Sequence, residues 1–214
     1  MLKESTRRRK RYELLAVAVT GLGKFLFMDF LNWKLPFIIL AVSAWILYVI
    51  YQLKKDPQVV RQWGFRTDTF WTCSKLVAPF GIAAVLIFFV IGHFNNTINL
   101  SWHIFPILLL YPIWGVIQQY LVVAMVAGNL QDLKTKRSSS FAIILVTALL
   151  FGLLHYPFWW LVIGTFLLAL LYGFVFLQVR NVYALGLFHG WLGSFFFYTV
   201  VGRDPFVEVF GRVF

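Results

Sequence analysis

Two glutamines and two histidines are the residues of this chain whose types and placement could do chemistry. Gln118 and Gln119 are adjacent within an apolar run over residues 104–127, and His155 and His189 lie in two later apolar runs. A neutral imidazole can act as a general base, and a side-chain amide can orient a water molecule or donate a hydrogen bond to an oxyanion. If the four side chains meet, they form either a polar functional site or a structural hydrogen-bond network.

The apolar runs predict that these side chains reach similar depths in a membrane. Counted from the predicted cytoplasmic helix ends, Gln118, His155 and His189 lie roughly 18, 21 and 11 Å deep at about 1.5 Å per residue. Helix tilt readily absorbs such differences. An amide or imidazole in hydrocarbon needs hydrogen-bond partners, because unmade hydrogen bonds cost a few kcal/mol there. We therefore expect Gln118, Gln119, His155 and His189 to converge.

The composition of the chain is that of a polytopic membrane protein. Of its 214 residues 61% are hydrophobic and 13% are charged, and the net charge is +11. Such an apolar chain predicts an all-α, polytopic membrane helical bundle. Its single cysteine, Cys73, excludes an internal disulfide and a cysteine metal cluster. Because the basic residues fall in short loops, membrane lipid is the expected partner and nucleic acid is not.

Hydropathy predicts about seven transmembrane helices. Lys24 and Asp29 interrupt the first of them, and we expect them to pair, to face protein or to reach the interface. Pro112 predicts a kink in the fourth. The predicted spans cover residues 14–31, 35–53, 76–91, 104–127, 141–155, 161–179 and 182–201.

Loop charges predict the orientation and the organisation of the chain. With the N-terminus inside, the cytoplasmic side carries most of the lysines and arginines, which is the usual asymmetry. We therefore predict an integral protein of the plasma (inner) membrane with a cytoplasmic N-terminus. Residues 1–12 are predicted to be a basic cytoplasmic tail, residues 13–75 a two-span region with an interfacial segment, and residues 76–214 a membrane core that holds the His/Gln cluster.

The motifs of this core resemble those of the CAAX-protease and bacteriocin-processing family of glutamic intramembrane proteases. That family carries Glu-Glu-x-x-x-Arg, then Phe-x-x-x-His, then His-x-x-x-Asn on successive spans. Here Phe151-Gly-Leu-Leu-His155 is intact, and a turn at Arg180-Asn181 leads to His189. The resemblance covers residues 104–201.

The resemblance implies a role for each matching position. Gln118 and His155 would stand where the family activates water, Gln119 and Val123 where it has a Glu–Arg pair, and His189 and Gly193 where it stabilises an oxyanion. Phe151 and Gly193 would belong to the substrate-binding part of the site. A glutamine cannot accept a proton near neutral pH, so the carboxylate base is missing unless Asp29 or a loop acid replaces it.

Three functions remain open on the sequence. The first is an intramembrane endopeptidase with altered active-site chemistry that acts on membrane-associated or lipidated peptides. The second is a catalytically inactive relative that binds a peptide or a partner membrane protein. The third is a small transporter or channel subunit, because polar residues at mid-membrane also line substrate paths. We predict no cofactor and no metal, since two histidines are fewer than the usual three protein ligands.

Overall fold

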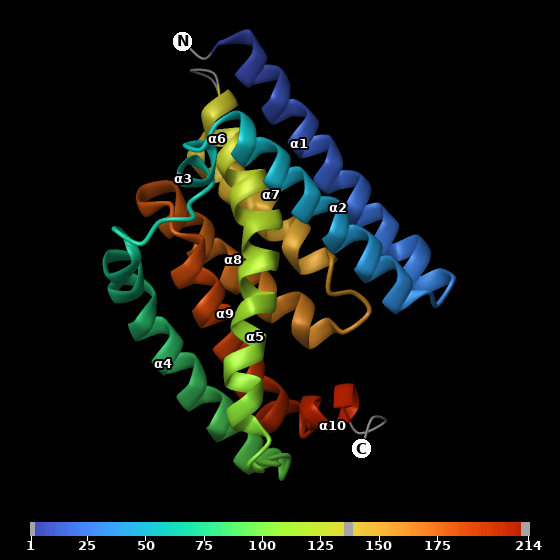
Figure 1. Cartoon of the computed structure of the whole chain (residues 1–214). Helices are drawn as coiled ribbons and strands as arrows, with labels where there is room; N and C mark the ends of the chain where they lie inside the picture. Colours follow the sequence, from blue (N-terminus) through green and yellow to red (C-terminus); the bar gives the residue numbers. More distant parts are fainter. Residues whose placement is uncertain (1–2, 135–138, 211–214) are drawn as a thin grey trace. The chain divides into compact units, whose positions relative to one another are not determined.

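Every regular element in the part of the chain that the structure describes is a helix. The computed structural model describes residues 3–134 and 139–210, and the elements in these ranges are α-helices joined by three π-helical stretches (Figure 1). The all-α class predicted from the sequence is confirmed. The chain forms two compact units, a first unit of Met1–Arg66 and Tyr120–Arg180 and a second unit of Thr67–Gln119 and Asn181–Phe214.

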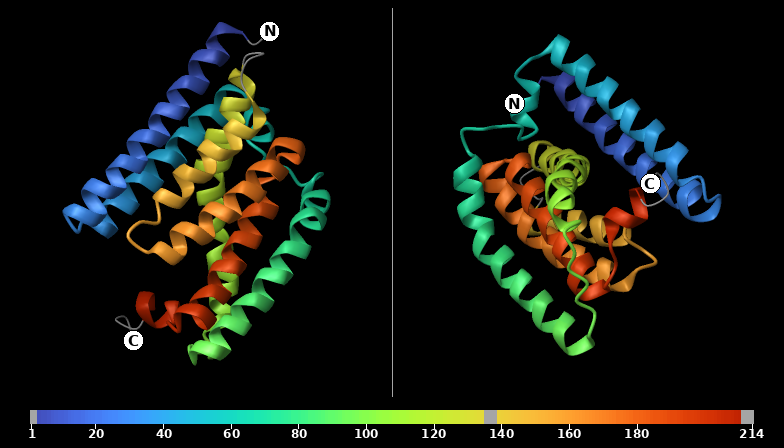
Figure 2. Two further views of the ribbon diagram at one scale, coloured as in Figure 1. Left: turned by 180° about the vertical axis from the view of Figure 1, so that it is seen from behind. Right: turned by 60° about the horizontal axis from the view of Figure 1, so that its bottom comes forward.

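The first unit contains the two N-terminal helices and the middle of the chain. Its elements are α1 (Glu4–Gly23), η1 (Lys24–Phe30), α2 (Lys34–Lys55), α3 (Val59–Gln62), η2 (Tyr120–Gly128), α6 (Asn129–Leu133), α7 (Ser140–Leu153) and α8 (Trp159–Val179). Helices α1 and α2 lie side by side (Figure 1) and are joined by hydrogen bonds from Trp45 to Thr20 and from Tyr48 to Glu13. Helices α7 and α8 also run side by side (Figure 2). Residues 4–12 of the predicted basic tail therefore belong to a helix packed within this unit.

The core of the first unit lies between η2, α7 and α8. Val122, Ala148, Phe151 and Ala169 form a buried cluster, with Ala148 and Ala169 completely inaccessible. Small side chains let the three helices approach closely, which is how membrane helices gain packing energy without a hydrophobic driving force. Phe151 is thus a core residue of this unit.

The second unit consists of α4 (Phe70–Asn95), α5 (Ile104–Gln119), α9 (Val182–Phe196), η3 (Phe197–Val201) and α10 (Pro205–Phe210). Helix α9 contacts both α4 and α5. A small apolar core of Ile104, Ile107 and Tyr198 lies at one end. Pro112 lies inside α5, as the sequence predicts.

Five helices of the described chain are long and apolar enough to cross a membrane. They are Lys34–Lys55, Phe70–Asn95, Ile104–Leu133, Trp159–Val179 and Val182–Val201, and Ser140–Leu153 is a shorter apolar helix. This confirms a membrane helical bundle, but two of the seven predicted spans differ. The predicted span 14–31 lies within α1 and η1, whose first half is charged, and the span 141–155 corresponds to α7, which has 14 residues. A perpendicular crossing needs about 20 residues.

Candidate functional site

The predicted site residues are divided between the two units. Phe151 lies on α7 and His155 in the turn after it, both in the first unit. The second unit contains Gln118 and Gln119 on α5 and His189 and Gly193 on α9. Convergence of His155 with the other residues stays a prediction.

His155 terminates α7 by binding one of its last carbonyl groups. Its Nδ1 lies 2.8 Å from the backbone oxygen of Phe151 and 3.2 Å from Oγ1 of Thr165. The Thr165 hydroxyl donates to the carbonyl of Leu161 at 2.6 Å, so its oxygen is left to accept. A carbonyl oxygen can only accept, so Nδ1 carries the proton and Nε2 keeps its lone pair. The ring also meets that of Phe151 edge-on, with centroids 4.9 Å apart.

The turn that carries His155 is held from the N-terminal part of the chain. Lys24 Nζ donates to the carbonyl oxygen of Tyr156 at 2.7 Å and pairs with Asp29 Oδ2 at 2.7 Å. Of the three expectations for Lys24 and Asp29, pairing is the one that the structure shows. Their proximity to the His155 turn could not be read from the sequence, because more than a hundred residues separate them.

The two adjacent glutamines differ in how deeply they are buried. Gln119 is completely buried, and neither its amide nitrogen nor its amide oxygen has a hydrogen-bond partner among the described residues. Gln118 is half-buried. Leaving a buried amide unsatisfied costs about 1–3 kcal/mol.

His189 lies on a helix that approaches α5 through glycines. A Cβ atom on Gly186 would lie 2.5 Å from the Cα of Val116, and one on Gly190 would lie 2.5 Å from the backbone carbon of Tyr111. Only glycine permits this distance between the helices. At Gly193 an added Cβ would meet only the Tyr111 ring, at an ordinary 3.8 Å. Packing therefore requires glycine at 186 and 190 but not at 193, the position where the resembled family has asparagine.

One protein-family model matches part of this helical core. Residues 120–195 match the family model described as type II CAAX prenyl endopeptidase, Rce1-like. Residues 120–195 are therefore CAAX-protease-like in sequence, within a membrane helical bundle. No curated protein and no solved structure matches the chain.

The bounds of the Rce1-like segment include the two histidines and leave out the two glutamines. It contains Phe151, His155, His189 and Gly193, and it begins immediately after Gln119. The match therefore confirms the predicted family resemblance over the part of the chain that keeps both histidines. The two glutamines, at which the sequence departs from the family motif, lie just outside it.

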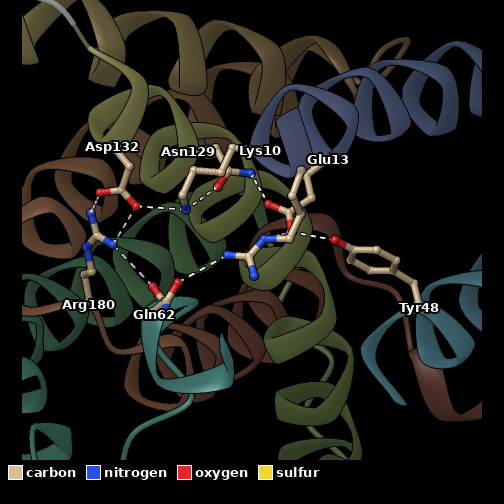
Figure 3. A network of polar contacts seen from close by, with 8 residues as sticks. Lys10, Glu13, Tyr48, Gln62, Asn129, Asp132 and Arg180 are labelled. Carbon is tan, nitrogen blue, oxygen red and sulfur yellow. Dashed lines mark hydrogen bonds and ion pairs between the residues drawn. The ribbon is translucent and has the colours of Figure 1, made fainter. Parts of the chain in front are cut away.

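A buried network of charged residues, which the sequence analysis did not identify, occupies the first unit (Figure 3). Lys10 and Glu13, on α1, are each 2% exposed. Lys10 Nζ donates to Asn129 Oδ1 at 3.2 Å and pairs with Asp132 Oδ2 at 3.0 Å. Glu13 accepts hydrogen bonds from Asn129 Nδ2 at 2.7 Å and from the Tyr48 hydroxyl at 2.6 Å.

The same network ends on Arg180, the residue after α8. Its guanidinium binds both oxygens of Asp132 and the backbone oxygen of Gln62 (Figure 3). Arg180 has a φ of +49°, which is unusual for a residue other than glycine. The tight turn predicted at Arg180-Asn181 is present: Arg180 ends α8 in the left-handed conformation while its side chain pairs with Asp132. The sequence offered no signal for the network beyond the charges themselves, because a basic run with one glutamate is usually solvated.

A second polar cluster surrounds Asp204 in the second unit. Its carboxylate accepts hydrogen bonds from His103 Nδ1 at 2.6 Å, Ser101 Oγ at 3.1 Å and the Tyr198 hydroxyl at 2.7 Å. Burial raises the pKa of Asp204, but these bonds, with one from the Val207 backbone, lower it more. The resulting pKa is about 2, compared with an ordinary 3.8. Within residues 3–134 and 139–210 no group of three or more metal-binding side chains occurs.

Proposed function

We propose that this CAAX-protease-like membrane protein is an intramembrane endopeptidase in which His155 is the general base. The observation that supports the proposal is the 2.8 Å contact between Nδ1 of His155 and the carbonyl oxygen of Phe151. With Nδ1–H held on the Phe151 carbonyl, the ring offers an unprotonated Nε2. Orienting an imidazole through its second nitrogen is the usual arrangement of a catalytic histidine.

In the proposed reaction, Nε2 of His155 removes a proton from a water molecule as the water attacks the scissile carbonyl carbon. Gln118 orients that water, and His189 donates a hydrogen bond to the oxyanion of the tetrahedral intermediate. When the carbon–nitrogen bond breaks, the proton on His155 passes to the leaving amine. No carboxylate is needed for this sequence of proton transfers.

The proposed substrate is a membrane-associated or lipidated peptide. The family matched by residues 120–195 is described as a prenyl endopeptidase, and Gln118 and His189 lie on helices that are long and apolar enough to cross a membrane. We further propose that the protein lies in the plasma membrane with its N-terminus in the cytoplasm.

A second candidate function is that of a catalytically inactive relative that binds a peptide or a partner membrane protein. It is favoured by the uncharged side chains of Gln119 and Val123. Both are completely buried, at positions where the resembled family carries a glutamate and an arginine. Loss of both charges leaves no stranded buried ion, which would be costly. The fold can therefore persist without the catalytic pair.

A cleavage assay on the purified protein distinguishes the two functions. A prenylated peptide is incubated in lipid nanodiscs with the wild type, His155→Ala, His189→Ala and Gln118→Glu. For an endopeptidase we expect wild-type turnover that falls about 10²–10⁴-fold in His155→Ala, because the general base is lost. Turnover only in Gln118→Glu would identify the natural protein as an inactive relative. Wild-type turnover that persists in both histidine variants would rule out the proposed mechanism.

A further inference from the structure

The end of α1 and the start of η1 contact the residues on both sides of His155. On one side, a Cβ on Gly21 would lie 3.3 Å from Cδ2 of Leu154, so α1 is in close contact with the residue before the histidine. On the other side, Lys24 Nζ donates a hydrogen bond to the carbonyl oxygen of Tyr156. Two independent contacts thus join residues 21–24 to a three-residue segment centred on His155.

The π-helical form of η1 is what brings Lys24 to Asp29. In an α-helix, residues five positions apart lie about 140° apart around the axis, on different faces. A π-helix closes its hydrogen bonds five residues apart, so the same two residues come onto one face. Here the Lys24–Asp29 distance of 2.7 Å spans the π-helical stretch Lys24–Phe30. Such stretches are rare and occur frequently at functional sites.

The contribution of this pair to overall stability is expected to be small. The side chains of Lys24 and Asp29 are 19% and 34% exposed. Ion pairs with this degree of exposure add little to the stability of a fold. A charged pair in contact with the His155 turn is therefore better explained by a local effect on that turn than by a need to hold the protein together.

We propose that Lys24 is a positioning residue for His155, and that Asp29 fixes the Lys24 ammonium group in place. The inference rests on the proposed function for its catalytic meaning. Lys24 anchors the Tyr156 carbonyl, and this keeps the ring of His155 oriented so that Nδ1–H remains on the Phe151 carbonyl. Both residues lie far outside the Rce1-like segment, so the N-terminal region becomes part of the machinery that orients the base.

The test follows the tautomer of His155 directly, without relying on turnover. Protein labelled with ¹⁵N-histidine is studied by NMR, and the His155 signals are assigned by their loss in His155→Gln. The variants are Lys24→Met, which removes the ammonium at similar length, Lys24→Arg, which restores a donor, and Asp29→Asn. Lys34→Met serves as the matched control, because Lys34 is exposed at the start of α2 in the same unit.

We expect the wild type and Lys34→Met to show one Nδ1–H tautomer. Lys24→Met should show a mixture of tautomers with little change in thermal unfolding temperature, Lys24→Arg should recover the wild-type spectrum, and Asp29→Asn should fall between them. A folded Lys24→Met with the wild-type His155 spectrum would overturn the inference. If Lys24→Met does not fold, an unchanged tautomer in Asp29→Asn overturns it and a mixed tautomer supports it.

Turnover separates this inference from the proposed function. If the wild type cleaves the prenylated peptide, kcat should fall about 10–100-fold in Lys24→Met while KM changes little, because the residue acts through the base and not on the substrate. If the wild type cleaves nothing, the endopeptidase proposal fails, and the tautomer measurement still decides whether Lys24 positions His155.

Discussion

Each charge in the buried network depends on several others for its hydrogen bonds. Lys10 is the only described cation that binds both Asn129 and Asp132, and it is 2% exposed. Removing one partner from a buried ion pair leaves the other without compensation, which costs far more than an exposed pair contributes. The stability of the first unit should therefore be much more sensitive at Lys10 than at the exposed lysines.

Lys10→Met should lower the free energy of unfolding by about 1–3 kcal/mol, because the buried Asn129 Oδ1 loses its donor and Asp132 keeps only Arg180 as a cationic partner. Lys54→Met, an exposed change at the end of α2, should stay within about 0.5 kcal/mol. Denaturant unfolding in detergent micelles measures both. Equal, small effects in the two variants would show that the network does not stabilise the unit.

At the scale of the elements, glycine determines how α5 meets α9. Gly115 and Gly186 face each other across the contact, and an added Cβ on either would overlap the backbone of the opposite helix. Neither helix can retreat without breaking the other contacts along the same interface, so the clash cannot be relieved by a side-chain rotation. By contrast, a Cβ on Gly164 of α8 would meet nothing within 4 Å.

Gly186→Ala should destabilise the protein by about 1–3 kcal/mol or more, because it overpacks the α5–α9 contact. Gly164→Ala should be neutral or stabilising by up to about 1 kcal/mol, since alanine is the better helix former. Thermal unfolding of the two variants side by side tests this. A harmless Gly186→Ala would show that the helices lie farther apart than described.

The short helix α10 is linked to the rest of the second unit through Asp204, and this link should depend on pH. The pKa of Asp204 is about 2 in the folded protein and about 3.8 when unperturbed, so the unfolded state takes up its proton first as the pH falls. The stabilisation is present above pH 4 and is lost between pH 4 and pH 2. The groups facing Asp204 are His103, Ser101 and Tyr198.

Asp204→Asn should therefore reduce the loss of stability between pH 4 and pH 2. Thermal unfolding temperatures measured across that range, with Asp56→Asn as a control in the connection after α2, test the prediction. An acid dependence identical in Asp204→Asn and the wild type would show that the carboxylate does not stabilise the second unit.

For the whole molecule, charge in the connecting segments should determine how the chain crosses the membrane. The segment 54–75 carries five lysines and arginines, and the segment 93–103 carries none. Positively charged segments stay on the cytoplasmic side. The two segments flank α4, a candidate span, and should therefore lie on opposite sides of the bilayer.

Single cysteines report this orientation once the native Cys73 is replaced by alanine. In intact cells, a membrane-impermeant maleimide should label Asn96→Cys and should label Lys55→Cys only after permeabilisation. The reverse pattern would contradict the predicted topology.

Composition and apolar run lengths were enough to predict an all-α membrane bundle, and the resemblance of short motifs predicted the CAAX-protease-like segment. These properties are local, or are repeated along the chain, and hydropathy and short motifs record them directly. Pairing of Lys24 with Asp29 was one of three expectations that the sequence left open. The second half of α1 is apolar when read alone, which made a span at 14–31 look plausible, but it belongs to a helix whose first half is charged.

The tertiary structure alone decided which nitrogen of His155 holds the proton and which residues anchor its turn. It also showed that a basic N-terminal segment contains two buried charges and that glycine is required at 186 but not at 193. Each of these depends on which atoms from distant parts of the chain meet within about 3 Å, and hydrogen bonds and steric overlap change sharply over that distance. No periodicity or composition in one sequence encodes such a meeting.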